Sequence, residues 1–199
     1  MPPKTLLEMA GISATPSRLS EAAVVVIDAQ RDYVDGALPL PQVRPALDEI
    51  ERLLARARAR ETPIIHIVHQ GRPGGAFAPG SDGAAIAPQA APAPGEPVIS
   101  KRLPNAFAST DLADRVAALK RPSIILVGFM THMCVEATAR AAIDLGLKAT
   151  VVANATATRE LPEPLTGATV SVAEVQRNAL AAMADRFATI ARDSSAIPD

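Results

Sequence analysis

Residues 122–146, PSIILVGFMTHMCVEATARAAIDLG, decide the fold that this sequence predicts. The apolar, β-branched run over residues 124–127 is typical of a buried strand, and Gly128 is expected to end it. Good helix formers dominate residues 133–145, and Gly146 stands where a left-handed C-terminal cap belongs. The stretch therefore predicts a strand, a tight turn and a helix. Cys134, the one cysteine of the chain, lies at the turn.

Strands and helices are expected to alternate along the rest of the chain. Further strand-length runs lie at residues 22–27, 63–68, 98–100, 149–152 and 187–191, and helical patterns at residues 4–10, 43–60, 110–119 and 171–186, the last with a capping box of Ser171 and Glu174. The run AAVVVI is apolar on both faces, as in parallel sheets. We therefore expect one domain over residues 1–199 with an α/β fold in three layers.

Composition narrows the class of protein. The 20 basic and 21 acidic residues are spread along the chain, so no basic patch suggests nucleic acid or an anionic membrane. One cysteine cannot form an intramolecular disulfide, and no apolar run reaches the roughly 18–20 residues of a spanning helix. The first residues lack the apolar core of a signal peptide. We expect a cytoplasmic protein without nucleic-acid or membrane partners.

Residues 70–97, rich in Gly and Pro, and residues 153–164 are expected to be loops. A loop as long as the first is usually functional or disordered. Three interpretations stay open for it: a lid, an oligomer contact, or a mobile surface segment.

Polar residues of catalytic type follow three of the predicted strands: Asp28, Lys101 and Cys134. If the strands are parallel, all three lie at the edge of the sheet where ligands usually bind. Asp28 could then take the proton of the Cys134 thiol. The charge of Lys101 and the N-terminus of the helix predicted at residues 133–145 would lower the pKa of that thiol. The simpler alternatives are a buried cysteine, a capping aspartate and a solvated lysine.

Three segments carry a resemblance to a known family: VVVIDAQRDYV at residues 24–34, ISKRLPNAFASTDL at residues 99–112 and GFMTHMCVEATARAAIDLG at residues 128–146. In order, spacing and residue type they resemble the motifs of the isochorismatase-like cysteine hydrolases. That superfamily includes nicotinamidases, N-carbamoylsarcosine amidases, biuret and ureidoacrylate hydrolases and streptothricin hydrolases. The resemblance implies a doubly wound, mostly parallel sheet of about six strands and a catalytic triad of Asp28, Lys101 and Cys134.

The resemblance also implies how the site would work. In the family a cis peptide precedes the nucleophile, which here would join Phe129 and Met130. The backbone N–H groups of Met130 and Cys134 would then form an oxyanion hole. Asp28 would deprotonate Cys134, the thiolate would attack an amide-type carbonyl, and water would hydrolyse the thioester. No cofactor is expected.

This sequence differs from the family motifs at several positions, and these differences indicate to which subfamily it is most similar. Nicotinamidases carry an Asp-x-His metal site after the second strand, where this chain reads HIVHQGRPGG. His66 and His69 are three apart in a strand and so point to opposite faces, which makes them poor co-ligands. We therefore predict no metal. Isochorismatases that cleave a vinyl ether lack the cysteine, so Cys134 favours C–N hydrolysis, and THMCVEATARAA is most similar to the cysteine hydrolases near streptothricin hydrolase.

Candidate substrate-binding residues lie in loops expected to surround the pocket. These residues are Tyr33, Gln70, Phe107, Phe129 and Thr131. Core packing is the alternative for each aromatic ring. His132 neighbours the nucleophile, but the family places that residue away from the sulfur, so a structural or rim position is expected for it.

The leading hypothesis is a cofactor-free cysteine hydrolase that cleaves a C–N bond of a small amide, ureido or lactam compound. Two alternatives remain: a vinyl-ether hydrolase of isochorismatase type in which Cys134 is incidental, and a non-catalytic small-molecule-binding member of the fold. The family further implies a homo-oligomer, either a dimer or a tetramer.

Overall fold

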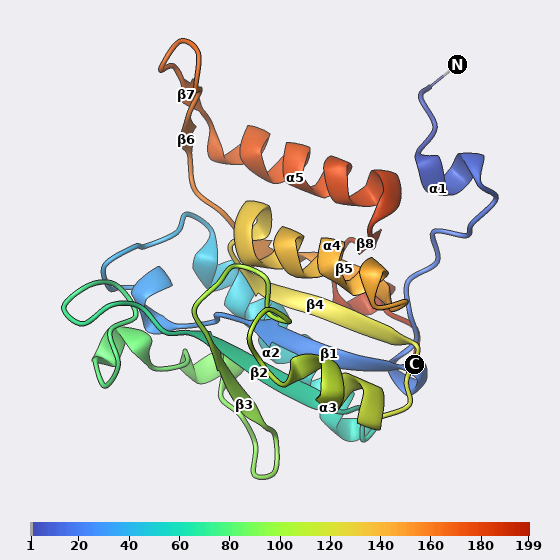
Figure 1. The fold of residues 1–199 in the computed structure, drawn as a ribbon, viewed down its shortest axis with the longest axis horizontal. Coiled ribbons are helices and arrows are strands. Elements are labelled where there is room, and N and C mark those ends of the chain that lie inside the picture. The colour runs from blue at the N-terminus through green and yellow to red at the C-terminus, as the bar shows by residue number, and fades with distance from the viewer. Residues whose placement is uncertain (1) are drawn as a thin grey trace.

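A six-stranded parallel sheet forms the centre of the computed structural model, which describes residues 2–199 (Figure 1). The strands are β1 (Ala22–Ile27), β2 (Ile64–His69), β3 (Val98–Lys101), β4 (Ser123–Phe129), β5 (Lys148–Ala157) and β8 (Thr189–Ala191). Their order in the sheet is β3-β2-β1-β4-β5-β8, and every neighbouring pair is parallel. The chain thus winds outward from β1 in one direction and from β4 in the other, as the doubly wound prediction requires.

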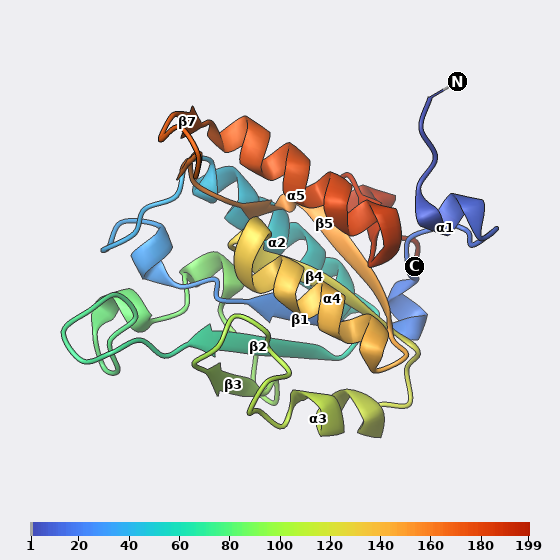
Figure 2. The ribbon, with the colours of Figure 1, turned by 45° about the horizontal axis from the view of Figure 1, so that its top comes forward.

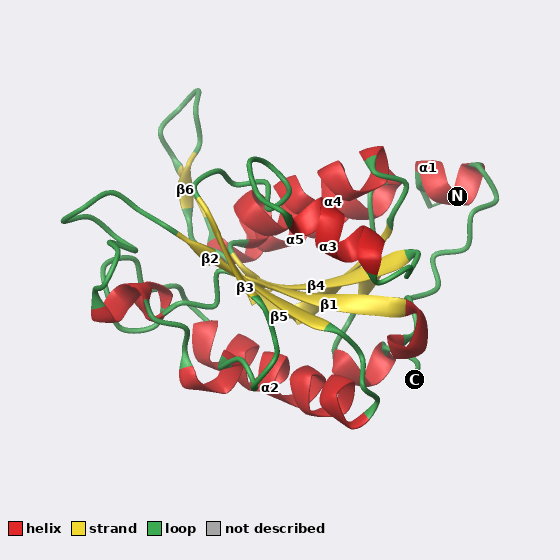
Figure 3. Ribbon diagram, turned by 60° about the horizontal axis from the view of Figure 1, so that its bottom comes forward, coloured by secondary structure: helices red, strands yellow, loops and turns green. Residues whose placement is uncertain are grey.

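Helices cover both faces of the sheet, which confirms the predicted α/β/α layers. The helices are α1 (Leu6–Met9), α2 (Val43–Ala59), α3 (Leu112–Ala118), α4 (Glu136–Asp144) and α5 (Val172–Arg186). Helix α2 lies on one face, and α3, α4 and α5 lie on the other (Figure 3). The order of the strands reverses between β1 and β4, and in such sheets this switch point is where ligands bind.

Two cores fill the space between the layers. All six residues of β1 are buried, as expected for a strand that is apolar on both faces. On the α2 side, Leu47 and Leu53 pack with Val24 and Val26. On the other side, the core joins side chains of α3, α4 and α5 to those of β4. The apolar stripe of α2 is therefore the reason that this long helix docks on the sheet.

Several elements and boundaries differ from the sequence prediction. The helix predicted at residues 133–145 is a π-helical turn, Thr131–Val135, followed by α4. Strand β5 extends to Ala157, and a small antiparallel hairpin of β6 (Leu161–Pro162) and β7 (Thr169–Val170) projects from the body in Figure 1 where a loop was expected. The Glu163 carboxylate accepts hydrogen bonds from the N–H groups of Leu165 and Thr166, and these bonds close the hairpin turn.

Strand β4 also runs one residue beyond Gly128, which was expected to end it. Gly128 has φ +112°, and a Cβ there would lie 1.9 Å from the carbonyl oxygen of Ile27. Glycine therefore does not stop the strand here. It lets β4 pass unusually close to the end of β1, which brings the segments after the two strands together.

The first part of the loop of residues 70–97 is tied to the loop that follows β1, and both lie at the carboxyl ends of the strands (Figure 2). The Gln30 amide donates to the carbonyls of His69 and Ala84 and accepts from the His69 N–H. The buried Asp32 carboxylate accepts hydrogen bonds from the N–H groups of Ala37 (2.8 Å) and Phe77 (2.5 Å). The loop is therefore a packed part of the fold, in contrast to the mobile-segment interpretation.

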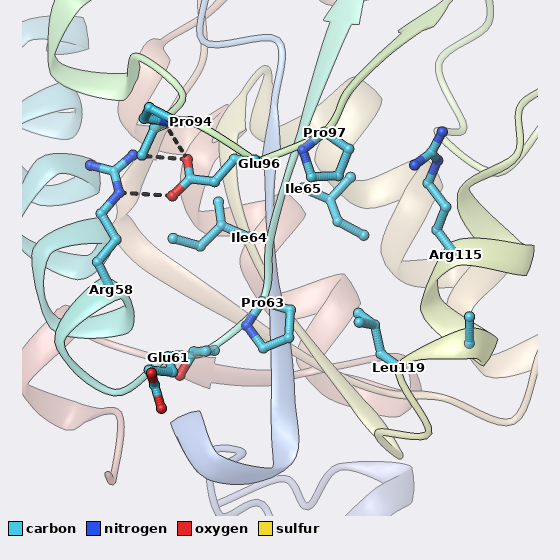
Figure 4. A pocket seen from close by; sticks show the side chains of 14 residues that line it. Arg58, Glu61, Pro63, Ile64, Ile65, Pro94, Glu96, Pro97, Arg115 and Leu119 are labelled. Carbon is cyan, nitrogen blue, oxygen red and sulfur yellow. Dashed lines mark hydrogen bonds and ion pairs between the residues drawn. The ribbon is translucent and has the colours of Figure 1, made fainter.

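A second anchor fixes the far end of this loop. Glu96 forms a two-pronged ion pair with Arg58 of α2 at 2.8 and 2.9 Å and bonds to the buried His66 ring at 2.8 Å. Figure 4 shows this pair on one side of a cavity of about 590 Å³, with Arg115 and Leu119 on the opposite side and Pro63 between them. Since Pro63 precedes β2 and His69 ends it, the cavity lies at the opposite end of β2 from the three catalytic-type residues.

Replacing Asp32 by Asn should destabilise the protein by about 2–4 kcal/mol, because two buried backbone donors would lose charge-assisted bonds. Gly36 and Gly83 press against this carboxylate, so little space exists for rearrangement. Urea unfolding measures the change. Asp35→Asn, three residues along and exposed, is the matched control and should stay within about 0.5 kcal/mol of wild type. Equal stability of the two variants would contradict this role of Asp32.

Candidate active site

The structure brings Asp28, Lys101 and Cys134 together at the carboxyl edge of the sheet. The Lys101 ammonium donates to Asp28 Oδ2 at 2.6 Å and to Cys134 Sγ at 3.3 Å. The side chains of Asp28 and Lys101 have no exposed surface, and Cys134 is 5% exposed. Two of the three simpler alternatives do not describe this arrangement, since the lysine is not solvated and the aspartate caps no helix. The cysteine is buried, as its alternative states, but it also contacts a charged group.

The backbone around each residue explains why they meet. Asp28 adopts a left-handed conformation (φ +50°), and its N–H bonds to the Ile67 carbonyl of β2. Lys101 ends β3 and reaches past the end of β2. The Thr138 hydroxyl of α4 donates to the Cys134 carbonyl and accepts from the N–H of Ala106. These two bonds connect the turn that carries Cys134 to the loop after Lys101.

Burial raises the pKa of the Asp28 carboxyl, and the adjacent Lys101 charge offsets this only in part. Its second oxygen, Oδ1, is buried and has no hydrogen-bond partner among residues 2–199. A buried carboxylate with a raised pKa and a free lone pair is a better base than an exposed one. Asp28 is therefore equipped to accept a proton from the thiol.

Burial first, and then the charge of Asp28, raise the pKa of the Cys134 thiol to about 12, because the charge of Lys101 offsets these two effects only in part. The sequence-based expectation of a lowered thiol pKa is wrong for this arrangement. It counted the cation and the helix N-terminus but not the loss of water or the neighbouring carboxylate. The resting site therefore holds a protonated thiol beside an ion pair, and ionisation has to accompany substrate attack.

The peptide bond between Phe129 and Met130 is cis, as predicted. The Met130 carbonyl accepts hydrogen bonds from the N–H groups of Met133 and Val135, which builds the π-helical turn that carries Cys134. Within residues 2–199 the Met130 N–H has no hydrogen-bond partner. The oxyanion role of the Met130 and Cys134 N–H groups remains a prediction.

His69 is a member of the site that the sequence interpretation passed over. Its Nδ1 lies 3.4 Å from the Lys101 ammonium, and the two residues are directly paired in register between β2 and β3. Burial lowers the His69 pKa and the Lys101 charge lowers it further, so the ring is neutral at pH 7. Asp28, Cys134 and His69 thus accept all three N–H bonds of the ammonium. The rule that found Lys101, a polar residue at a strand end, applied equally to His69.

The predicted substrate-binding residues fall into different environments. Tyr33 is buried, and its ring lies tilted against Phe77 and edge-on to Phe129. Burial raises the pKa of its hydroxyl, and the charge of Asp28 raises it further. Thr131 is fully buried, and its hydroxyl has no partner within residues 2–199.

The other predicted contacts are placed less directly. Phe129 has no exposed surface and belongs to the core, Phe107 is half-buried against the core that contains Cys134, and Gln70 accepts a hydrogen bond from Arg102. The structure therefore places Tyr33 within the electrostatic influence of Asp28, leaves the Thr131 hydroxyl without a partner in residues 2–199, and engages Phe129 and Gln70 elsewhere.

The three histidines have separate partners. His66 bonds to Glu96, His69 contacts Lys101, and His132 Nδ1 lies 2.5 Å from the Thr158 hydroxyl. His66 and His69 thus point to opposite faces, as expected, and His132 does not contact the sulfur. Within the described residues, no group of three or more His, Cys, Asp or Glu side chains is arranged to hold a metal ion.

The chain is similar to proteins of one family over nearly its whole length. The family model described as "Isochorismatase domain" matches residues 22–194. A crystal structure of an isochorismatase from Pseudomonas putida KT2440 superposes with a TM-score of 0.93 at 37% identity, covering 98% of this chain and 100% of that one.

Sequence relatives differ in what their names describe. A secreted isochorismatase effector of Verticillium dahliae is 34% identical over 92% of this chain and 93% of its own length. A streptothricin hydrolase of Streptomyces noursei is 33% identical over 88% of this chain and 64% of its own length. A maleamate amidohydrolase of Pseudomonas putida is 32% identical over 65% of this chain and 69% of its own length.

Replacing Asp28 by Asn should speed alkylation of Cys134 by iodoacetamide. The charge of Asp28 raises the thiol pKa, so its removal lowers that pKa and increases the thiolate fraction at a given pH. A drop of one pKa unit gives about a tenfold faster rate well below the pKa. The rate between pH 6 and 10, followed by intact mass, measures the effect.

Asp35→Asn removes an exposed carboxylate near the same loop and should leave the alkylation rate unchanged. A wild-type thiol that titrates near the ordinary cysteine value, about 8.5, or an Asp28→Asn variant slower than wild type, would contradict this description of the resting site.

Proposed function

This chain belongs to the isochorismatase family, and we propose that it is a cysteine hydrolase that cleaves the C–N bond of a small amide, ureido or lactam substrate. The observation that carries the proposal is the pair of contacts from the buried Lys101 ammonium to Asp28 and Cys134. A cysteine needs a base to become a nucleophile. The Asp28 carboxylate, which is paired with the same Lys101 ammonium that contacts the sulfur, supplies that base.

The first half of the reaction forms a thioester. Cys134 passes its proton to Asp28 Oδ1 while the sulfur attacks the carbonyl carbon, and Lys101 stabilises the sulfur charge as it develops. The carbonyl oxygen becomes an oxyanion that the N–H groups of Met130 and Cys134 bind. Asp28 then gives the proton to the leaving nitrogen, the C–N bond breaks, and the amine departs.

The second half restores the enzyme. Asp28 takes a proton from a water molecule, whose oxygen attacks the thioester carbonyl in the same oxyanion hole. The C–S bond breaks, the carboxylic or carbamic acid departs, and the sulfur recovers its proton from Asp28. One water is consumed for each C–N bond, and Asp28 takes part in all four proton transfers.

Relatives support this reaction class. The names streptothricin hydrolase and maleamate amidohydrolase describe hydrolysis, and the second specifies an amide. A vinyl-ether hydrolase remains the alternative, because the family model takes its name from isochorismatase. That reaction does not require a thiol, so the requirement for Cys134 separates the two candidates.

The compartment and the assembly are further parts of the proposal. Residues 2–199 include no helix with the length and apolar character needed to cross a membrane. We propose a reducing, cytoplasmic compartment because the mechanism needs Cys134 as a free thiol, although one relative is named a secreted effector. Cell fractionation tests this. The expected dimer or tetramer is a proposal that light scattering on the purified protein tests.

Cys134→Ala should reduce amide hydrolysis by at least about 10³-fold, since the nucleophile of a covalent mechanism is lost. The assay is ammonia release from a panel of primary amides and ureido compounds. Cys134→Ser keeps the size of the side chain but is a poorer nucleophile, so it should also be strongly impaired.

Thermal unfolding of both variants near the wild-type temperature shows that the fold is intact. Hydrolysis of isochorismate that survives Cys134→Ala would favour the vinyl-ether alternative, and amide hydrolysis that survives it would contradict the thioester mechanism. If iodoacetamide alkylates Cys134 of the wild type but the untreated wild type hydrolyses no compound of the panel, a binding protein would be favoured.

A further inference from the structure

The imidazole of His69 is held in one orientation at the end of β2. The buried Gln30 amide accepts from the His69 N–H at 2.8 Å and donates to the His69 carbonyl at 3.0 Å, so both backbone polar groups of this residue are fixed. The Phe77 ring stands at 83° to the imidazole, with 5.6 Å between the two centroids. Asp32 in turn binds the Phe77 N–H. The loops after β1 and β2 therefore position the ring together.

The Lys101 ammonium has three N–H donors, and its surroundings offer three acceptors. These are Asp28 Oδ2 at 2.6 Å, Cys134 Sγ at 3.3 Å and His69 Nδ1 at 3.4 Å. The lysine side chain has no exposed surface, so bulk water does not replace an acceptor that is lost. A buried charged donor without an acceptor costs more than an unpaired neutral group. The His69 nitrogen therefore completes the coordination of the ammonium.

This contact also selects one tautomer of the histidine. An ammonium only donates, so Nδ1 has to be the acceptor. Burial lowers the His69 pKa and the Lys101 charge lowers it further, so the ring is neutral at pH 7. A neutral imidazole that accepts at Nδ1 carries its proton on Nε2. The opposite tautomer would direct an N–H group at the ammonium.

The direction of the ammonium matters for the sulfur. Burial and Asp28 raise the pKa of the Cys134 thiol, and Lys101 is the group that lowers it. A hydrogen bond weakens steeply when the donor turns away from its acceptor. Of the two triad partners, the carboxylate binds the ammonium at the shorter distance, so an ammonium without a third acceptor would turn toward Asp28 at the expense of the sulfur.

We propose that His69 is a positioning residue for the chemistry of Cys134: its Nδ1 holds one N–H of the Lys101 ammonium and thereby keeps another N–H directed at the sulfur. The inference rests on the proposed role of Cys134 as the nucleophile and adds a fourth residue on which the reactivity of the thiol depends. His69 acts through Lys101 and takes no part in the proton transfers.

The test compares three substitutions of His69 by the rate at which iodoacetamide alkylates Cys134 at pH 8, followed by intact mass. Leucine fills similar space but offers no acceptor. His69→Leu should slow alkylation by about threefold to tenfold, because a weaker contact with Lys101 raises the thiol pKa and one pKa unit is tenfold in thiolate. His69→Asn, whose Oδ1 takes the position of Nδ1, should restore most of the rate. His69→Gln, whose amide reaches the position of Nε2 instead, should remain slow.

The matched control is His66→Leu, the same change three residues earlier in β2. Burial lowers the His66 pKa, so this ring is also neutral, but it bonds to Glu96 on the other face of the sheet. Its loss should leave the alkylation rate unchanged, and thermal unfolding of every variant checks the fold. The proposal is overturned if His69→Leu is alkylated as fast as wild type or faster, if His69→Asn stays as slow as His69→Leu, or if His66→Leu is slowed equally.

A spectroscopic measurement tests the same contact in the unaltered protein. In wild type labelled with ¹⁵N-histidine, the His69 signals are identified by their absence from the His69→Asn spectrum. At pH 7 they should report an unprotonated Nδ1 and a protonated Nε2. A ring protonated on Nδ1, or on both nitrogens, would overturn the proposal even if His69→Leu does not fold.

Turnover separates this inference from the proposed function. On an amide that wild type hydrolyses, His69→Leu should lower kcat about tenfold with little change in KM, since the lost interaction acts on the developing sulfur charge. A change in KM alone would indicate a substrate contact and overturn the positioning role. Slower alkylation of His69→Leu in a protein that hydrolyses no amide would support the positioning role and contradict the hydrolase. Amide hydrolysis with kcat and alkylation both insensitive to His69→Leu would support the hydrolase and overturn the positioning role.

Discussion

The candidate active site depends on the ion pair between the Lys101 ammonium and the Asp28 carboxylate. Neither side chain has any exposed surface. Either charge alone would be buried at a cost of several kcal/mol, and loss of one partner from such a pair typically destabilises a protein by about 3–5 kcal/mol. The pair spans from β3 to β1 across the end of β2. It therefore fixes the ammonium where it can also reach Cys134 and His69.

The same burial that makes the pair costly explains the resting chemistry. In a dry site the thiol keeps its proton, since a thiolate would add a second negative charge beside Asp28. When a bound substrate supplies a carbonyl carbon for the sulfur to attack, the unpaired Oδ1 of Asp28 can accept the thiol proton. Reactivity is thus coupled to substrate binding, and the thiol is sheltered from solution oxidants in between.

Local sequence patterns predicted what depends on local sequence. The apolar strands, the Ser171 capping box and the polar residues Asp28, Lys101 and Cys134 at strand ends were all found from spacing and residue type. What the patterns missed depends on contacts distant in sequence. The thiol pKa reflects burial, and the packed loop of residues 70–97 reflects the Asp32 carboxylate.

The most direct test of the account is rapid acid quenching during turnover, followed by intact mass of the protein. The account predicts a transient mass increase equal to the acyl part of the substrate, carried by the peptide that contains Cys134 and removed by hydroxylamine, as for a thioester. Since the chain has one cysteine, the site of modification is unambiguous. Covalent catalysis by Cys134 would be contradicted by steady turnover that depends on Asp28 but shows no adduct at any quench time.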